Sequence, residues 1–159
     1  MAYLIDGNNF IGHILPHGLR DPESKYLLVS KLLIFQKIKK TKILVAFDGP
    51  PDPNLTENSI HEKSFSIIFP SFDQNADMTI KEIISKQSDL RRFFVVSSDN
   101  EIRSYARSKG ANSLNCENFN RQLKEALKEY RRLSEVKKNV SLPSPLEVNH
   151  WMEIFKKKK

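Results

Sequence analysis

Short apolar runs alternate with amphipathic segments along most of the chain. Four runs are rich in apolar and β-branched residues and are bounded by turn residues or charges: 3–5, 43–47, 65–69 and 93–97. Runs of this kind predict β-strands. The nearly unbroken apolar character of 93–97 is typical of a strand covered on both faces of its sheet. A weaker fifth strand is expected at 113–114.

Helical periodicity occupies most of the segments between these strands. Apolar residues recur three and four positions apart in 23–39, 77–86 and 117–137, which predicts three helices. A further helix is expected after Asp99, ending at Gly110, because glycine readily adopts the left-handed conformation that closes a helix.

A last helix and two loops complete the prediction. Ser144 has the properties of an N-cap, with Pro145 at the first helical position, and this pair predicts a helix start. Gly7-Asn8-Asn9 predicts a turn after the first strand. About a dozen polar residues after Pro51 predict a loop.

Strands that alternate with helices predict a doubly wound α/β fold. Right-handed crossovers between parallel strands place helices on both faces of a mainly parallel sheet. We therefore expect one domain at 1–159, with a basic C-terminal helical extension from about 117 to 159. In such folds ligands bind beyond the carboxyl ends of the strands.

Composition narrows the class of protein. An apolar content of 39%, with ten phenylalanines, favours a globular chain over a disordered one. The lone cysteine, Cys116, excludes an internal disulfide and suits a reducing compartment. No apolar run approaches the roughly 20 residues that span a bilayer, and no cationic leader precedes the first strand. We expect a cytoplasmic protein without a membrane partner.

Positive charge is concentrated near the C-terminus. Residues 1–120 contain 15 basic and 14 acidic side chains, a net of +1. Residues 121–159 contain 11 basic and 5 acidic side chains, a net of +6. This asymmetry favours a polyanionic partner such as RNA, although a solvated helix and a frayed lysine tail explain it equally well.

Aspartates occupy the ends of three predicted strands. Asp6, Asp48 and Asp99 each follow an apolar run, and Asp77 begins a predicted helix. Because the carboxyl ends of parallel strands meet at one edge of a sheet, we expect these four side chains to converge. Converging carboxylates repel one another, and a divalent cation such as Mg²⁺ or Mn²⁺ relieves that repulsion.

A metal held by carboxylates suits phosphodiester hydrolysis, because it activates water and stabilises charge on the leaving oxygen. Each aspartate taken alone is more often structural than functional, because aspartate is common just after strands and at helix N-caps. A haloacid-dehalogenase-type phosphatase needs Asp-x-Asp after the first strand, but Gly7 and Asn8 follow Asp6. Phosphate-binding glycine loops and zinc-like histidine spacing are absent from the sequence. The pattern favours a nuclease.

Three segments together resemble a known family. Residues 4–9, Leu-Ile-Asp-Gly-Asn-Asn, resemble the opening motif of the NYN domains, a branch of the PIN-like nucleases. Asn75-Ala76-Asp77 resembles their helix-opening motif, and residues 95–99 resemble their late strand ending in Ser-Asp. The order and spacing agree, and a C-terminal helix containing Trp151 is similar to that of the YacP-like bacterial branch.

This resemblance implies a metal-dependent endoribonuclease. Its principal ligands would be Asp6, Asp77 and Asp99, with Asp48 as an additional acidic member. The remaining implied roles are a polar site residue at Asn9 and a residue that orients Asp99 or a metal-bound water at Ser98.

One position departs from the family pattern. The YacP-like branch often has a second acidic residue after the helix-opening aspartate, whereas this chain has Met78. The loss of one carboxylate would weaken affinity for a second metal, and Asp73 is a candidate to compensate.

Candidate RNA contacts come from basic residues on predicted helices. Lys81 and Arg103 follow Asp77 and Asp99 by about one turn, although a solvated helix position is the more frequent explanation for each. The C-terminal candidates are Lys124, Lys128 and Arg131.

Two alternatives to an endoribonuclease stay open. One is a non-catalytic RNA-binding or ribosome-associated module on the same fold, which Met78 favours. The other is a structure-selective DNA nuclease on a related fold, since fold alone does not distinguish RNA from DNA.

Overall fold

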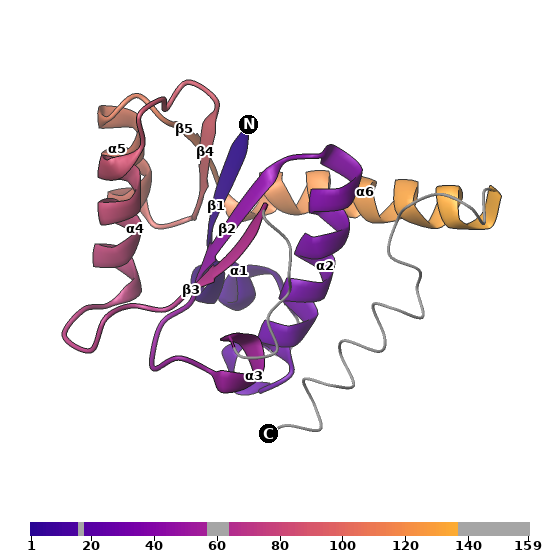
Figure 1. The fold of residues 1–159 in the computed structure, drawn as a ribbon, viewed down its shortest axis with the longest axis horizontal. Helices are drawn as coiled ribbons and strands as arrows, with labels where there is room; N and C mark the ends of the chain where they lie inside the picture. The colour runs from indigo at the N-terminus through magenta and orange to yellow at the C-terminus, as the bar shows by residue number, and fades with distance from the viewer. Residues whose placement is uncertain (16–17, 57–63, 137–159) are drawn as a thin grey trace.

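The computed structural model describes residues 1–15, 18–56 and 64–136 (Figure 1). The helix predicted after Ser144 and the terminal lysines therefore lie outside the described residues. Within the described ranges, no helix combines the length and apolar character needed to cross a bilayer.

A five-stranded parallel sheet forms the centre of the structure. Its strands are β1 (Ala2–Asp6), β2 (Lys42–Ala46), β3 (Phe65–Ile68), β4 (Phe93–Val96) and β5 (Asn112–Leu114). They lie in the order β3-β2-β1-β4-β5, and every neighbouring pair is parallel. The first strand, β1, is the central strand of the sheet: the chain adds β2 and β3 on one side of it and then β4 and β5 on the other. The α/β fold predicted from the sequence is confirmed.

Helices cover both faces of this sheet (Figure 1). One layer contains α1 (Gly7–Ile14), α2 (Ser24–Lys39) and α6 (Cys116–Val136). The other contains α4 (Ala76–Lys86) and α5 (Asn100–Ser108). Two short helices lie in connections, η1 (Gly18–Arg20) and α3 (Pro53–Thr56), the latter inside a segment predicted as a loop.

Alternation along the strands divides the core between the two layers. Tyr3 and Ile5 pack toward α2 and α6, whereas Leu4 between them packs toward α4 and α5. The first of these layers is aromatic. The Tyr3 and Phe35 rings meet edge to face with their centroids 5.3 Å apart, and the centroid of the Phe119 ring lies 5.1 Å from that of Phe35. Aromatic pairs at such distances add to the stability gained by burial alone.

The region after β1 differs from the prediction. The sequence predicts a turn at Gly7-Asn8-Asn9, but α1 begins directly at Gly7. Asp6 occupies the N-cap position in an extended conformation, and Phe10 and Ile11 are fully buried. Burial of this apolar face stabilises a short helix that local turn propensity does not reveal.

Gly7 fits where a larger residue does not. A Cβ atom at this position would lie 2.6 Å from two ring carbons of Phe47 and 2.9 Å from the backbone oxygen of Ala46. The backbone contact cannot be relieved by rotating a side chain. Glycine is therefore required for α1 to start this close to β2.

We predict that Gly7→Ala lowers the free energy of unfolding by about 1–3 kcal/mol, the usual cost of forcing extra atoms into a packed core. Gly12→Ala in the same helix is the matched control, because a Cβ there meets nothing within 4 Å. It should be neutral or stabilising by about 0.5–1 kcal/mol. Urea unfolding of both variants tests this, and equal stability for the two would contradict the tight contact.

Candidate functional site

Four aspartates from separate segments line one cavity at the carboxyl edge of the sheet. The cavity has a volume of about 410 Å³. It is bordered by Asp6, Asp48, Asp77 and Asp99, the four residues predicted to converge. We refer to it as the acidic cavity. Its other polar lining residues include Asn8, Asn9 and His13.

Asp6 and Asp99 owe their positions to neighbouring strands. Asp6 ends β1 in the middle of the sheet and is only 4% exposed. β4 pairs with β1 up to Val96, so the chain reaches Asp99 just beyond the same edge. Asp99 caps α5, and its Oδ1 accepts hydrogen bonds from the backbone N–H groups of Glu101 at 2.8 Å and Ile102 at 3.3 Å.

The other two aspartates connect β2 with α4. Asp48 follows β2, and its Oδ1 accepts a hydrogen bond from the backbone N–H of Ala76 at 3.2 Å. The Asn8 side chain accepts the backbone N–H of Asp48 at 2.8 Å, which ties α1 to the same loop. Asp77 lies in the first turn of α4, where the helix dipole favours a carboxylate.

Ser97 connects two of the aspartates. Its buried hydroxyl donates a hydrogen bond to Asp6 Oδ2 at 2.9 Å. The Ser97 hydroxyl oxygen also accepts a hydrogen bond from the backbone N–H of Asp99 at 3.1 Å. The family resemblance implies an orienting role for Ser98 instead, but the Ser98 hydroxyl accepts a hydrogen bond from the backbone N–H of Cys116 at 3.1 Å. The available signal for Ser97 was a polar residue directly after an apolar buried strand.

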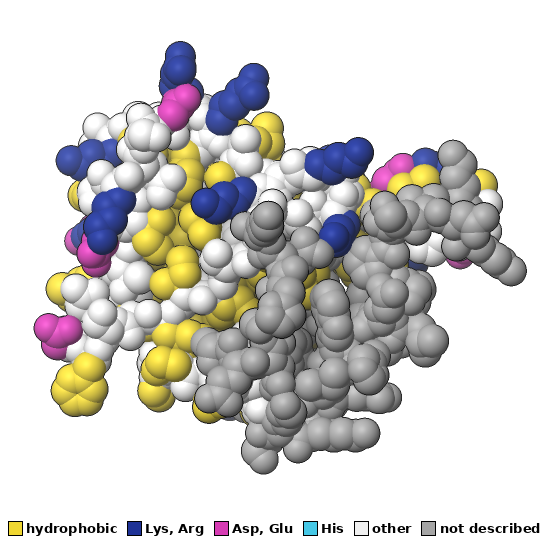
Figure 2. Space-filling model, in the orientation of Figure 1, with side chains coloured by type: hydrophobic (Ala, Val, Ile, Leu, Met, Phe, Trp, Pro, Cys, Tyr) yellow, Lys and Arg dark blue, Asp and Glu magenta, His cyan; other side chains and the backbone are white. Residues whose placement is uncertain are grey.

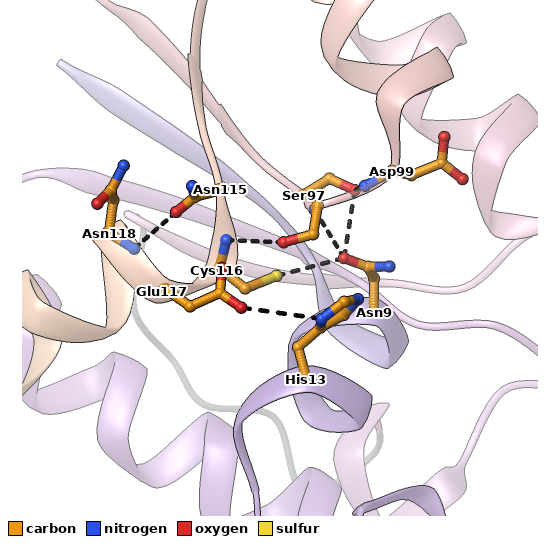
Figure 3. Close-up of polar contacts among 9 residues, drawn as sticks. Asn9, His13, Ser97, Asp99, Asn115, Cys116, Glu117 and Asn118 are labelled. Carbon is orange, nitrogen blue, oxygen red and sulfur yellow. Dashed lines mark hydrogen bonds and ion pairs between the residues drawn. The ribbon is translucent and has the colours of Figure 1, made fainter.

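Asn9 joins three elements beside this contact (Figure 3). Its Oδ1 accepts the backbone N–H of Ser98 at 2.8 Å and the thiol of Cys116 at 3.2 Å. Figure 3 shows the Asp99 carboxylate directed away from this network. His13 lies 3.9 Å from Glu117 at the rim, a contact that sequence spacing did not indicate. Asn9 thus holds α1, the end of β4 and the start of α6 together.

Burial and like charge disfavour ionised carboxylates in the acidic cavity. The pKa of Asp6 is raised from its ordinary 3.8 to about 6, first by burial and then by the charges of Asp77 and Asp99. The hydrogen bond from Ser97 acts in the opposite direction. The pKa of Asp77 is also raised, first by burial and then by the charges of Asp99 and Glu101.

The donor chemistry of the cavity fits a hard divalent cation. Carboxylate oxygens are the ligands that Mg²⁺ and Mn²⁺ prefer, and the repulsion among them is what a cation removes. The side chains are not already arranged as a ligand set: within the described ranges, no three His, Cys, Asp or Glu residues lie close enough to hold one ion. Asp48 and Asp99 instead direct an oxygen to backbone N–H groups.

None of the predicted RNA-binding residues lines the acidic cavity. Lys81 pairs with Glu101 at 2.6 Å, and Arg103 Nε donates to the Ser113 hydroxyl at 3.2 Å. The remaining candidates are exposed on α6: Lys124, Lys128 and Arg131.

Positive charge also gathers at the opposite edge of the sheet, where the strands begin. Figure 2 shows lysine and arginine side chains along the top of the molecule, above the ends from which the strands of Figure 1 start. We call this surface the basic edge. Its exposed residues are Lys39, Lys40, Lys42, Arg91, Arg92 and Lys109.

Comparison with known families identifies the domain. Residues 3–156 match the description "YacP-like NYN domain". The chain belongs to the YacP-like NYN domain family. The resemblance drawn from the three sequence motifs is therefore confirmed, and the NYN domain is a PIN-like nuclease domain. No curated protein matched the chain.

Two solved structures of a YacP protein share this fold. The crystal structure of Rae1 (YacP) from Bacillus subtilis superposes with a TM-score of 0.71 at 19% identity, covering 87% of this chain and 82% of that one. Its W164L mutant gives a TM-score of 0.68 at 18% identity, covering 97% and 91%. These likenesses at low identity establish the fold and leave the activity to be argued from the site.

The Ser97 hydroxyl should control the protonation of Asp6. Because this hydrogen bond lowers the pKa of Asp6, we predict that Ser97→Ala raises it above about 6. Ser98→Ala is the matched control, since the Ser98 hydroxyl contacts the Cys116 backbone instead. Carbon NMR titration of the carboxyl in EDTA measures both values. If the pKa of Asp6 shifted only in Ser98→Ala and not in Ser97→Ala, the role assigned to the Ser97 hydroxyl would be refuted.

The raised pKa of Asp6 should also make stability depend on pH. A carboxyl whose folded pKa lies above its unfolded pKa stabilises the fold below the unfolded value, and this contribution is lost as pH rises through the folded value. Between about pH 4 and 6 the free energy of unfolding should fall by up to about 3 kcal/mol. Asp6→Asn should remove this fall in urea unfolding in EDTA, and the exposed Asp73→Asn should not. If the free energies of unfolding of wild type and Asp6→Asn changed with pH in parallel, this prediction would be wrong.

Proposed function

We propose that this YacP-like NYN domain is a metal-dependent endoribonuclease that uses Mg²⁺ or Mn²⁺ to hydrolyse RNA. The observation that supports this most is the convergence of four aspartates from four segments on one cavity. Family membership in a PIN-like nuclease domain supports the same reaction class. Convergence of this kind is costly to a fold without a cation, and this cost favours a functional role for the site.

The residues divide into ligands and positioning residues. Asp6, Asp77 and Asp99 would hold the metal, and Asp48 is a further carboxylate at the same edge. When bound, such a metal supplies an activated water and stabilises charge on the phosphodiester and its leaving oxygen. Ser97 orients the Asp6 carboxylate through its 2.9 Å hydrogen bond.

Asn9 fixes the backbone around the ligands. By accepting the Ser98 N–H at 2.8 Å, it sets the course of the chain between β4 and Asp99. Removal of this contact would allow Asp99 to shift relative to Asp6, and small displacements of a reacting group lower rates strongly.

RNA binding requires positive surface away from the cavity itself. Two surfaces of the described residues could supply it: the basic edge and the exposed lysines of α6. Contacts from either to phosphates would make the affinity fall with salt concentration. Lys81 contributes less than the sequence suggested, because Glu101 already neutralises it.

A non-catalytic RNA-binding module, whether on the ribosome or free, is the second candidate. The observation that favours it is Met78, which is 50% exposed where the family often has a second acid. The exposed Asp73 does not line the acidic cavity and so offers no evident replacement.

The decisive test is cleavage of a labelled RNA pool in Mg²⁺ and in Mn²⁺ by wild type, Asp99→Asn and Asp73→Asn. We expect wild type and Asp73→Asn to cut the RNA. Asp99→Asn should lose at least about a hundredfold in rate, because a missing ligand removes several kcal/mol of charge stabilisation.

Calorimetric titration of Mn²⁺ into the same three proteins separates binding from turnover. Weaker binding only in Asp99→Asn would accompany its loss of cleavage. If wild type binds RNA without cutting it in either metal, the non-catalytic module replaces the enzyme.

A further inference from the structure

Large apolar side chains are exposed on the segments that line the acidic cavity or lead into it. Five large hydrophobic residues are exposed in the described ranges, and two of them, Met1 and Val136, lie at the ends of those ranges. Of the other three, Leu19 lines the cavity, Met78 directly follows the cavity residue Asp77, and Phe72 precedes the cavity residue Ala76 by four positions.

Phe72 is the most exposed of the set. Its exposure is 108% of the reference value, so the ring touches essentially nothing. The backbone N–H of Gln74 donates to the Ser71 oxygen at 2.9 Å, which makes Phe72 the second residue of a hydrogen-bonded turn. Figure 2 shows hydrophobic side chains protruding at the corner where Figure 1 draws the loop before α4.

This turn has a fixed relation to the acidic cavity. It leads into Asn75, which caps α4 by accepting the Met78 N–H at 2.9 Å. The next residue, Ala76, donates its backbone N–H to Asp48. Phe72 is thereby presented a few residues before Asp77, on backbone anchored to one of the site carboxylates.

The charge of the cavity limits what can bind beside it. Four carboxylates repel phosphates, so a nucleic acid gains little affinity there from its backbone alone. Its bases provide another source of affinity, because every unpaired base has a face that stacks on an aromatic ring. A protruding phenylalanine four residues before a cavity-lining residue meets that requirement, whereas paired bases in a duplex are not accessible to it.

We propose that Phe72 is a stacking platform for an unpaired base of single-stranded RNA, adjacent to the phosphate held at the acidic cavity. Leu19 and Met78 are further exposed apolar side chains that would contact neighbouring bases and sugars. This inference rests on the proposed function and specifies its substrate: single-stranded RNA, bound without strong sequence preference.

The test is fluorescence anisotropy with a labelled 12-nucleotide single-stranded RNA, in EDTA and in Ca²⁺. Phe72→Ala should weaken binding about five- to a hundredfold, the range for loss of one stacked base. Phe72→Trp should bind within about twofold of wild type, because it retains an aromatic face. Phe72→Leu is the matched control, since it preserves apolar area without a ring, and it should bind as weakly as Phe72→Ala.

Duplex RNA of the same sequence provides the second control. All four proteins should bind it equally, and thermal unfolding should not distinguish them, because the Phe72 ring lies outside the core. The proposal is overturned if Phe72→Ala retains wild-type affinity for single-stranded RNA, if Phe72→Leu does so, or if wild type does not bind that RNA.

Cleavage in Mn²⁺ is measured separately with the same proteins. Binding that depends on an aromatic residue 72, without any cleavage by wild type, would refute the nuclease and retain the stacking platform. Cleavage by wild type, together with unchanged RNA binding by Phe72→Ala, would retain the nuclease and refute the stacking platform.

Discussion

A carboxylate buried at the end of the central strand is the constraint on which this site depends. Asp6 is almost fully inaccessible and faces the charges of Asp77 and Asp99, so its ionised form is disfavoured unless something compensates. Within the protein, the Ser97 hydroxyl provides part of that compensation. A divalent cation would provide the rest, which is why the proposed function and the electrostatics of the fold have the same origin.

The surrounding hydrogen bonds hold the site to this strand from several directions. Asn9 reaches from α1 to the turn after β4, and Asp48 reaches from the end of β2 to the start of α4. Each contact uses a side chain to satisfy a backbone N–H that the sheet and helices leave unpaired. The aspartates are therefore positioned by the ends of regular elements, where rigid strands and helices limit their movement.

Charge is separated across the length of the sheet. Carboxylates gather where the strands end, and exposed lysines and arginines gather where they begin. A strand of five residues spans about 16 Å, so the two regions are separated by more than a Debye length at physiological salt. RNA drawn to the basic edge would not be held at the acidic cavity by that attraction alone. This separation gives apolar and aromatic contacts around the cavity their proposed importance.

The pattern of apolar and polar residues along the chain was enough to locate most of the elements and the edge where the site lies. Apolar runs gave four strands within about a residue of their observed bounds, and parallel topology then required Asp6, Asp48 and Asp99 to meet at one edge. Local patterns do not include distances between elements, however. Only the tertiary structure showed α1 at Gly7, the Ser97 contact with Asp6, the pairing of Lys81 with Glu101 and the exposure of Phe72. Each of these depends on which side chains approach across elements far apart in the chain, and periodicity within one element does not encode that approach.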